Sequence, residues 1–269
     1  MKCPHCGQEH PDNQIECPST GNGLKKACIN EKCSYYGEYL WPLEKEDCPC
    51  CGHPLYNTHR GHWFVDLGLS VKWATCNVGA MKPEDCGDYF AWSETTSKSA
   101  YTWYNLKGLF IDEIQSELRK QVECFINAGV QMTDNANWLL WFSKYKYQCW
   151  LDPEDDAARM NWRGEWRIPM AHEYYELIDK CNWERSIING VEGCRVTSKL
   201  NGHSIFLPTF GYRDGSSLLE VGSLGCYWSS SLYTNNHLYA NFLRFTSGND
   251  YSLDHRYLRC GLSVRPVCP

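Results

Sequence analysis

Short apolar runs, separated by Gly, Ser and Asn, predict a chain built mainly from short strands. Two runs, at 64–69 and 71–74, are broken by glycine and serine, as strands next to turns often are. Runs at 195–198 and 204–207 flank an Asn-Gly pair and predict a hairpin. Three further strands are predicted at 227–231, 239–245 and 257–267, and the polar segments between them, 232–237 and 249–255, are predicted to be loops.

Apolar residues with helical spacing occur at three places. Between 109 and 125 they recur every three or four positions behind two acidic residues, which predicts a helix in an inserted segment. At 152–163 Asp152 is the predicted N-cap and Pro153 the first helical residue. A third helix is predicted at 171–181. The last two helices, beside antiparallel strands, predict an α+β fold.

Length and charge limit the classes of protein to consider. A chain of 269 residues has room for one good-sized domain and a small one. The net charge of −6 gives no reason to expect nucleic acid as a partner, because its binders usually carry a concentrated basic face. No apolar run is long enough for a membrane span, and the first residues lack an apolar signal segment, so we expect a cytoplasmic protein.

Seventeen cysteines, eight of them in the first 51 residues, point to metal rather than disulfides, because no signal segment accompanies them. Cys28 and Cys33, followed by Cys48 and Cys51, form two short knuckles that together predict a four-cysteine zinc site. Cys50 lies inside the second knuckle and is not an expected ligand. A four-thiolate zinc keeps no open position, so its expected role is structural.

A second zinc ribbon is suggested by Cys3, Cys6 and Cys17, but its pattern is incomplete. Thr20 stands where the fourth cysteine is expected. Either a histidine, His10 or His5, completes the site, or the ribbon is degenerate and holds metal poorly. These ribbons occupy 1–56 in the predicted organisation, with a linker at 57–62 and the main domain at 63–269.

The last forty or so residues have an unusual composition. From 229 to 263 there is no Lys, Glu, Gln, Met or Trp, although these are common elsewhere in the chain. A codon such as AAC, randomised only at its adenines, encodes many polar and aromatic residues but none of these five. The segment 226–263 is therefore predicted to be a diversified surface.

The flanking motifs resemble those of a known family. The variable end, from Cys226-Tyr227-Trp228-Ser229-Ser230 to Ser263-Val264-Arg265-Pro266, resembles proteins diversified by retroelements, in which an error-prone reverse transcriptase rewrites adenines inside a C-type-lectin-like domain. Upstream phrases are similar to the FISUMP-type (major paralogous) domain of gut Bacteroidota: Val71-Lys72-Trp73-Ala74-Thr75, Gly87-Asp88-Tyr89-Phe90-Ala91-Trp92, Trp166-Arg167-Ile168-Pro169, Ile205-Phe206-Leu207-Pro208 and Gly211-Tyr212-Arg213.

This resemblance covers roughly residues 60–269 and implies a C-type-lectin-like fold in which 65–69 lies near 262–267. It also implies a ligand-binding variable protein, whose partner is a protein or surface ligand without fixed identity, and a possible homo-oligomer. The expected binding residues are Tyr227, Leu232, Tyr233, Asn235, Asn236, His237, Tyr239, Asn241, Leu243, Arg244, Asp250, Tyr251, Ser252, Leu253, Asp254, His255 and Tyr257. Of these, Leu243 and Tyr257 could equally face the core.

Three other functions were weighed against this one. Calcium-dependent sugar binding is disfavoured because the Glu-Pro-Asn, Gln-Pro-Asp and Trp-Asn-Asp motifs are missing, so no calcium is expected. An oxidase of the formylglycine-generating type needs a reactive cysteine pair, and no base accompanies Cys226, Cys260 or Cys268 in the sequence, so catalysis is not expected. The third is a zinc-ribbon adapter of a phage particle or cytoplasmic assembly, with the main domain as an interaction module.

Overall fold

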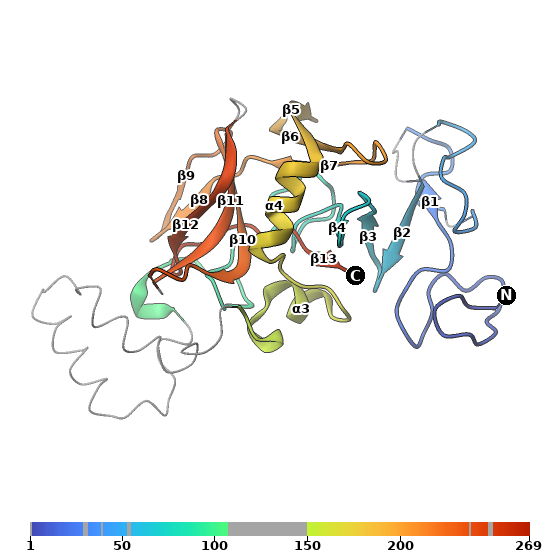
Figure 1. Ribbon diagram of the computed structural model, residues 1–269, viewed down its shortest axis with the longest axis horizontal. Coiled ribbons are helices and arrows are strands. Elements are labelled where there is room, and N and C mark those ends of the chain that lie inside the picture. Colours follow the sequence, from blue (N-terminus) through green and yellow to red (C-terminus); the bar gives the residue numbers. More distant parts are fainter. Residues whose placement is uncertain are drawn as a thin grey trace, which may run out of the picture.

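The computed structural model of the protein describes residues 2–28, 32–38, 40–52, 55–106, 150–236, 238–246 and 250–269. The helix predicted at 109–125 and the residue His237 lie outside the described residues. Within them, antiparallel strands dominate and the helices are few and short (Figure 1). The chain is therefore sheet-rich, with two cysteine clusters in its first 51 residues.

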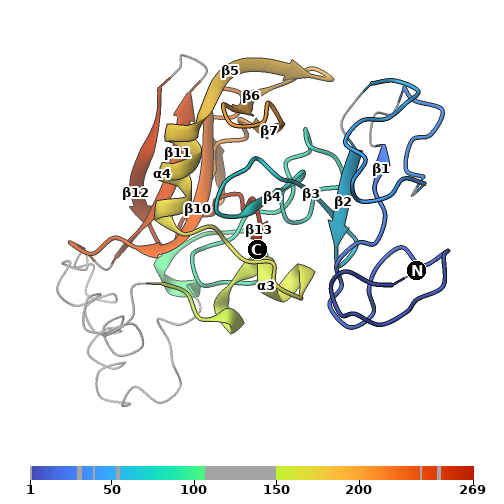
Figure 2. The same ribbon diagram turned by 45° about the vertical axis from the view of Figure 1, so that its right-hand side comes forward.

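A five-stranded sheet joins the cysteine-rich start to the rest of the chain. Its order is β1-β2-β3-β4-β13, and the strands are β1 (Ala27–Cys28), β2 (Leu55–His59), β3 (His62–Val65), β4 (Lys72–Ala74) and β13 (Val267–Cys268). Figure 2 shows β2 and β3 between the N-terminal lobe and the main body. The lobe is thus attached through strand pairing as well as through the chain.

The segment predicted to be a linker, 57–62, is a tight β-hairpin instead. Strands β2 and β3 pair from Asn57 opposite Phe64 to His59 opposite His62. The two turn residues, Arg60 and Gly61, have φ of 52° and 79°, and this left-handed pair matches the twist of a two-residue hairpin. The polar composition of the segment reflects a turn, not a flexible connection.

The two ends of the main body meet in this sheet, with β4 between them. Val65 pairs with Trp73, and Trp73 pairs with Val267. The expected proximity of 65–69 and 262–267 therefore arises through an intervening strand. The long strand predicted at 257–267 is wrong, because only Val267–Cys268 forms a strand there; the preceding residues make isolated bridges to other segments.

A second sheet has the order β5-β6-β7, formed by β5 (Cys181–Ile188), β6 (Val191–Ser198) and β7 (Ser204–Pro208). Pairing of β6 with β7 confirms the predicted hairpin. The first hairpin of this sheet was not predicted, although Asn189 and Gly190, with φ of 48° and 83°, form the two-residue turn that an Asn-Gly pair favours.

The third sheet, β10-β11-β12, contains the predicted variable segment. Its strands are β10 (Leu224–Leu232), β11 (Tyr239–Thr246) and β12 (Tyr251–Tyr257), and a separate hairpin, β8 (Tyr212–Asp214) with β9 (Ser217–Leu219), precedes them. The prediction of a loop at 249–255 is wrong over most of its length, because residues 251–257 pair with residues 239–245 of β11. Its polar residues face solvent while Leu253 packs inward, and strand formation depends on such a half-buried surface rather than on polarity.

The helices lie beside this sheet and below it in Figure 1. The helix α4 (Ala171–Lys180) confirms the prediction at 171–181 and contacts all three strands of the β10-β12 sheet.

The helix predicted to start at Asp152 begins later in the chain. Residues Pro153–Asp155 form a 3₁₀ turn (η2). The helix α3 (Ala157–Trp162) follows it and is capped by Asp156, which accepts a hydrogen bond from the Arg159 N–H at 3.0 Å. Asp156 also accepts a hydrogen bond from the Ile168 N–H, so the N-cap of α3 has two hydrogen-bond donors. A further 3₁₀ turn, η1, spans Trp103–Asn105.

Arg265 is completely buried in the middle of the main body. Its guanidinium donates to Asn77 Oδ1 at 2.9 Å, to the carbonyls of Ala74 and Thr75, and to the carbonyl of Phe206 at 3.0 Å. Burial lowers the pKa of Arg265, yet the four acceptors satisfy the charged form. One side chain thus connects the segment after β4, the edge strand β7 and the closing segment of the chain.

Replacement of the Arg265 side chain should lower the stability of the folded protein. Arg265→Met leaves buried oxygens without donors, and we expect the free energy of unfolding to fall by about 3–5 kcal/mol. Arg185→Met is the matched control, since Arg185 forms an exposed ion pair with Glu192 and its loss should cost less than about 1 kcal/mol. Urea denaturation of both variants measures the difference, and equal losses would contradict the role assigned to Arg265.

Candidate metal sites and a candidate binding surface

The four cysteines of the complete ribbon come together as predicted. The sulfurs of Cys28, Cys33, Cys48 and Cys51 all lie within 4.8 Å of one another, with Cys28 to Cys51 at 3.6 Å and Cys33 to Cys48 at 3.7 Å. The knuckles are shaped by tight turns, in which the Gly52 N–H bonds to the Cys48 carbonyl at 2.8 Å. Four sulfurs converging without a disulfide could hold one metal ion.

The incomplete ribbon has a histidine in its fourth position. Cys3, Cys6, Cys17 and His10 place their ligand atoms within 4.8 Å of one another, and His10 Nε2 is 3.4 Å from the Cys6 sulfur. His5, the other candidate, instead directs its Nε2 at the Gly23 carbonyl, 3.2 Å away. The geometry therefore favours His10 between the two histidines that the sequence left open.

Thr20 stands where a fourth cysteine is expected. It is not a candidate ligand itself, but its side chain forms a hydrogen bond with the candidate ligand Cys17. A hydrogen bond from its side chain is the main reason that the pKa of Cys17 is lowered to about 5. A thiol with this pKa is a thiolate at neutral pH, and the thiolate is the form that binds metal. The substitution thus leaves the site with three sulfurs and one imidazole, a donor set typical of structural zinc.

Two other groups of potential metal ligands are not part of the cysteine clusters. Cys50 is exposed and contacts the Ser34 hydroxyl at 3.5 Å, away from the four sulfurs, as expected from the spacing. Asp152, Glu154 and Asp155 also lie within 4.8 Å of one another, but acidic residues at the start of a helical segment are explained by the helix dipole.

The two clusters predict a specific pattern of metal loss. We expect one metal ion per cluster in the purified protein, measured by elemental analysis together with native mass spectrometry. Cys51→Ser and His10→Ala should each lose one ion, because a tetrahedral site with three ligands binds far more weakly. The matched controls Cys50→Ser and His5→Ala should retain both ions; loss of metal from His5→Ala but not from His10→Ala would reverse the ligand assignment.

Aromatic side chains from the predicted variable segment form a row on one face of the β11-β12 pair. Tyr239 lies opposite Tyr257 with ring centroids 4.4 Å apart, and His255 stacks on Tyr233 at 4.1 Å. His255 also meets Tyr239 edge-on at 5.3 Å. Trp103, from η1, extends the row by an edge contact with Tyr257 at 5.6 Å. We call these five residues the aromatic row.

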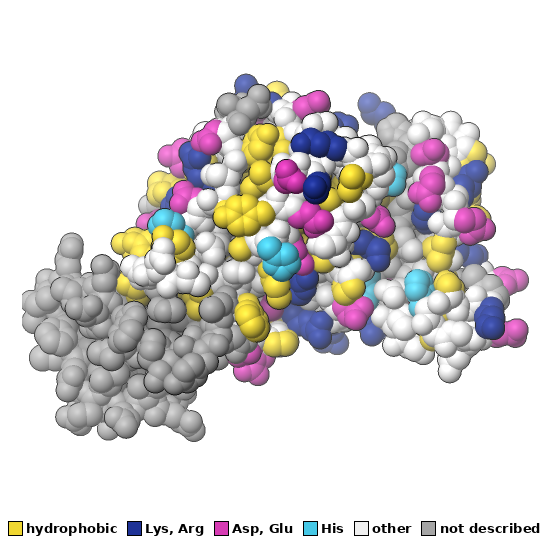
Figure 3. Space-filling model, in the orientation of Figure 1, with side chains coloured by type: hydrophobic (Ala, Val, Ile, Leu, Met, Phe, Trp, Pro, Cys, Tyr) yellow, Lys and Arg dark blue, Asp and Glu magenta, His cyan; other side chains and the backbone are white. Residues whose placement is uncertain are grey.

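The aromatic row is bordered by polar groups with fixed positions. Asn241, opposite His255, donates to the Leu232 carbonyl at 2.9 Å, and Asn235 donates to the Tyr233 hydroxyl at 3.2 Å. At the other end the guanidinium of Arg259 pairs with Asp214 and lies 5.5 Å from the Tyr257 ring. Figure 3 shows hydrophobic side chains and a histidine gathered over β12 at this edge of the molecule. The result is a partly exposed aromatic strip with hydrogen-bonding ends.

For three of the expected binding residues the prediction is wrong, because their side chains are buried and cannot contact a ligand at the surface. Tyr227, Leu232 and Leu243 are 1%, 2% and 0% exposed. Leu232 packs in the first core cluster, which includes Trp166 and Trp228. Tyr227 and Leu243 pack in the second core cluster, which includes Trp73 and Tyr174, and the Tyr227 hydroxyl donates to the Pro208 carbonyl at 2.8 Å. Of the two residues whose orientation the sequence left open, Leu243 is inside and Tyr257 is 36% exposed.

The remaining expected residues divide between two faces of the sheet. Those accompanying the aromatic row are Tyr233, Asn235, Tyr239, Asn241, His255 and Tyr257, with Asn236 in the adjoining turn. Arg244 and Asp250 form an ion pair elsewhere, and Ser252 and Asp254 share the Arg244 side of β12. Tyr251 and Leu253 are half-buried against the second core cluster, where Tyr251 stacks on Trp183 at 5.0 Å.

Sequence reasoning missed Trp103 and Arg259 as members of this surface. Trp103 precedes the variable segment by more than a hundred positions, and no local pattern connects it with β12. Arg259 falls within 226–263 but in the part predicted to be a strand interior. Only the folded arrangement brings both beside Tyr257.

The three cysteines considered for catalysis, Cys226, Cys260 and Cys268, are buried. Burial raises the pKa of Cys226 to about 12, of Cys260 to about 11 and of Cys268 to about 12, so these thiols are protonated at neutral pH. Glu173 is engaged by Arg167 and by the Met170 N–H, which fixes the start of α4. Each of these contacts serves the packing of the frame.

Comparison of the chain with family models, curated proteins and solved structures finds no match. Among the described residues, none of the helices has the length and apolarity needed to cross a bilayer. Acidic and basic side chains are interspersed on the face shown in Figure 3.

Proposed function

We propose that the protein is a ligand-binding variable protein whose aromatic row, presented on a C-type-lectin-like frame, is the contact surface. The observation that carries this proposal is the row itself: five aromatic rings in contact with one another, at the partly exposed end of one face of the β11-β12 pair, with Tyr233 from the adjoining turn and Trp103 from η1. Tyr and His rings combine a large apolar area with a polar end, and their restricted side chains lose little entropy on binding.

The composition of the surface supports diversification. Tyr233, Asn235, Tyr239, Asn241 and His255 have residue types that adenine mutation of an AAC-like codon can produce. Their contacts include one another and the backbone carbonyls at the end of β10. Substitution at such positions leaves the packed core intact. A surface whose residues differ between copies of the gene requires this property.

The frame beneath the surface supports it from two sides. Phe242 and Ala240 on β11 pack into one core cluster, whereas Leu243 and Phe245 pack into the other. The strand that carries Tyr239 and Asn241 is therefore clamped between two hydrophobic cores. A contact surface on a strand fixed in this way is pre-organised, which reduces the entropy lost on binding.

For the N-terminal lobe we propose two structural zinc ions. Cluster Cys28, Cys33, Cys48 and Cys51 offers four thiolates, and the other cluster offers three with one imidazole. Both donor sets fill a tetrahedral zinc, leaving no position for substrate. The lobe is small and contains two minor hydrophobic clusters, so the burial of apolar side chains contributes little folding free energy. Zinc binding would supply the rest.

The proposal predicts that the aromatic row contributes little to stability. We expect the double variant Tyr239→Ser with His255→Ser to lose less than about 2 kcal/mol of unfolding free energy, because Tyr239 is only half-buried and His255 is exposed. The control Tyr227→Ser, in the same sheet but buried, should lose about 3–5 kcal/mol. Chemical denaturation of both variants measures this, and a double variant as damaged as the control would place the row in the core instead.

A selection experiment tests the binding function directly. Positions 233, 235, 239, 241, 255 and 257 are randomised in the displayed full-length chain, and the library is selected against several unrelated folded proteins. We expect binders to each target that retain both metal ions. A second library, randomised at the buried positions 227, 243 and 245, should give few displayed chains; equal success of both libraries, or failure of the first, would contradict the proposal.

A further inference from the structure

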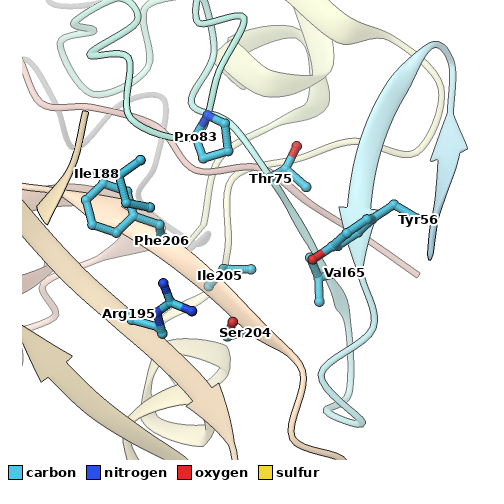
Figure 4. A pocket seen from close by; sticks show the side chains of 9 residues that line it. All are labelled: Tyr56, Val65, Thr75, Pro83, Ile188, Arg195, Ser204, Ile205 and Phe206. Carbon is cyan, nitrogen blue, oxygen red and sulfur yellow. The ribbon is translucent and has the colours of Figure 1, made fainter. Parts of the chain in front are cut away.

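A small pocket lies where the N-terminal lobe meets the main body, away from the aromatic row. Its volume is about 140 Å³, and Figure 4 shows the side chains around it. Tyr56 and Val65 come from β2 and β3, and three residues come from the edge strand β7. The lining residues are Tyr56, Val65, Thr75, Pro83, Ile188, Arg195, Ser204, Ile205 and Phe206.

Three side-chain donors of the pocket have no partner within the described residues. The guanidinium of Arg195 and the hydroxyls of Tyr56 and Ser204 form no hydrogen bond or ion pair there, whereas the Thr75 hydroxyl contacts the Trp63 carbonyl at 3.5 Å. No acidic residue is among the described lining residues. The pocket therefore presents two neutral donors and the exposed guanidinium of Arg195, and Glu184, opposite Arg195 on β5, forms no ion pair with it.

The environment of Tyr56 keeps its hydroxyl a donor. Burial raises the pKa of Tyr56 and outweighs the opposing effect of the nearby Arg195. The phenol is thus protonated throughout the physiological range. Opposite it, Ile205, Phe206 and Ile188 provide apolar walls, so a ligand needs an anionic group beside an apolar one.

A longer groove continues from this pocket. It has a volume of about 750 Å³ and shares Thr75, Pro83, Ile188 and Arg195 with the pocket. Its other lining residues include Met81, Ile187 and Tyr36, which are 89%, 59% and 50% exposed, and Trp63. Glu84 also lines the groove, but its carboxylate already accepts a hydrogen bond from Asn189 at 2.7 Å.

We propose that the pocket binds the C-terminal carboxylate and last apolar side chain of an extended peptide, whose preceding residues lie in the groove. Arginine with neutral hydroxyl donors suits a planar carboxylate, and a chain terminus is captured in this way in other recognition modes. A phosphate dianion fits the pocket less well, since Arg195 is the one cation among its described lining residues, and Lys32 and Lys82 line only the adjoining groove.

The dimensions agree with this occupant. A cavity of about 150 Å³ holds a molecule of the size of benzene, so the pocket has room for one short side chain and its carboxylate. The remainder of a ligand must leave through the shared wall at Thr75 and Arg195 into the groove. There Trp63 and Met81 offer the exposed apolar contacts that a free small acid would not use.

The test uses the full-length, metal-loaded protein and four probes in isothermal titration calorimetry. These are the tetrapeptide acetyl-Ala-Val-Val-Leu with a free carboxylate, the same peptide as its C-terminal amide, the same peptide extended by a C-terminal glycinamide, and isovalerate. We expect the free-acid peptide to bind at least about tenfold more tightly than either amide, because charge-assisted hydrogen bonds to the carboxylate are lost in both.

Matched variants assign the contact to the pocket. Arg195→Gln should weaken the free-acid peptide about tenfold or more and Tyr56→Phe by a smaller factor, while Arg185→Gln, at another exposed arginine of the same sheet, should leave binding unchanged. Circular dichroism and metal content verify that each variant is folded. Equal binding of the acid and the amide, an unaffected Arg195→Gln, or no binding of the peptide at millimolar concentration would overturn the proposal. Isovalerate binding as tightly as the peptide would also overturn it, in favour of a small-acid site.

Discussion

The buried guanidinium of Arg265 is the charged group on which the packing of the main body depends. A charge removed from water is tolerated only when its donors are satisfied, and here oxygens of Asn77, Ala74, Thr75 and Phe206 provide that. Three of these acceptors lie nearly two hundred residues before Arg265 in sequence, and the fourth, Phe206, lies 59 residues before it. The closing segment, the beginning of the domain and the edge strand β7 must therefore take one relative position for the charge to be accommodated.

The same arrangement places the N-terminal lobe. His59, at the end of β2, is buried; its Nδ1 lies 2.8 Å from Asn22 Oδ1 in the lobe, and its Nε2 accepts the Glu165 N–H at 3.0 Å. Its carbonyl accepts the indole N–H of Trp166 at 2.8 Å. Burial lowers the pKa of His59, which keeps the ring neutral and able to accept. A lobe held by a neutral histidine and a paired strand is oriented on the main body, and this orientation creates the pocket beside Tyr56 and Arg195.

The aromatic row occupies the opposite side of the same frame. Because β11 is held between two cores, its outward residues can differ without moving the strand. The buried arginine and the two cores thus fix the frame, and the exposed surfaces are left for the proposed contacts. The proposed recognition surfaces, the row and the terminus pocket, share no residue and can be altered separately.

The sequence by itself determined the features that rest on local spacing. The cysteine knuckles, the helix α4 and the β6-β7 hairpin follow from contacts between near neighbours, and the fourth thiolate of the first ribbon was visibly missing. Tertiary structure decided what depends on which face of a strand is covered: Tyr227 and Leu243 are core, Tyr257 is surface, and the polar segment at 251–257 is a strand. It also selected His10 over His5 and brought Trp103 to Tyr257. Local sequence does not contain these outcomes, because each is fixed by a partner that packs from elsewhere in the chain.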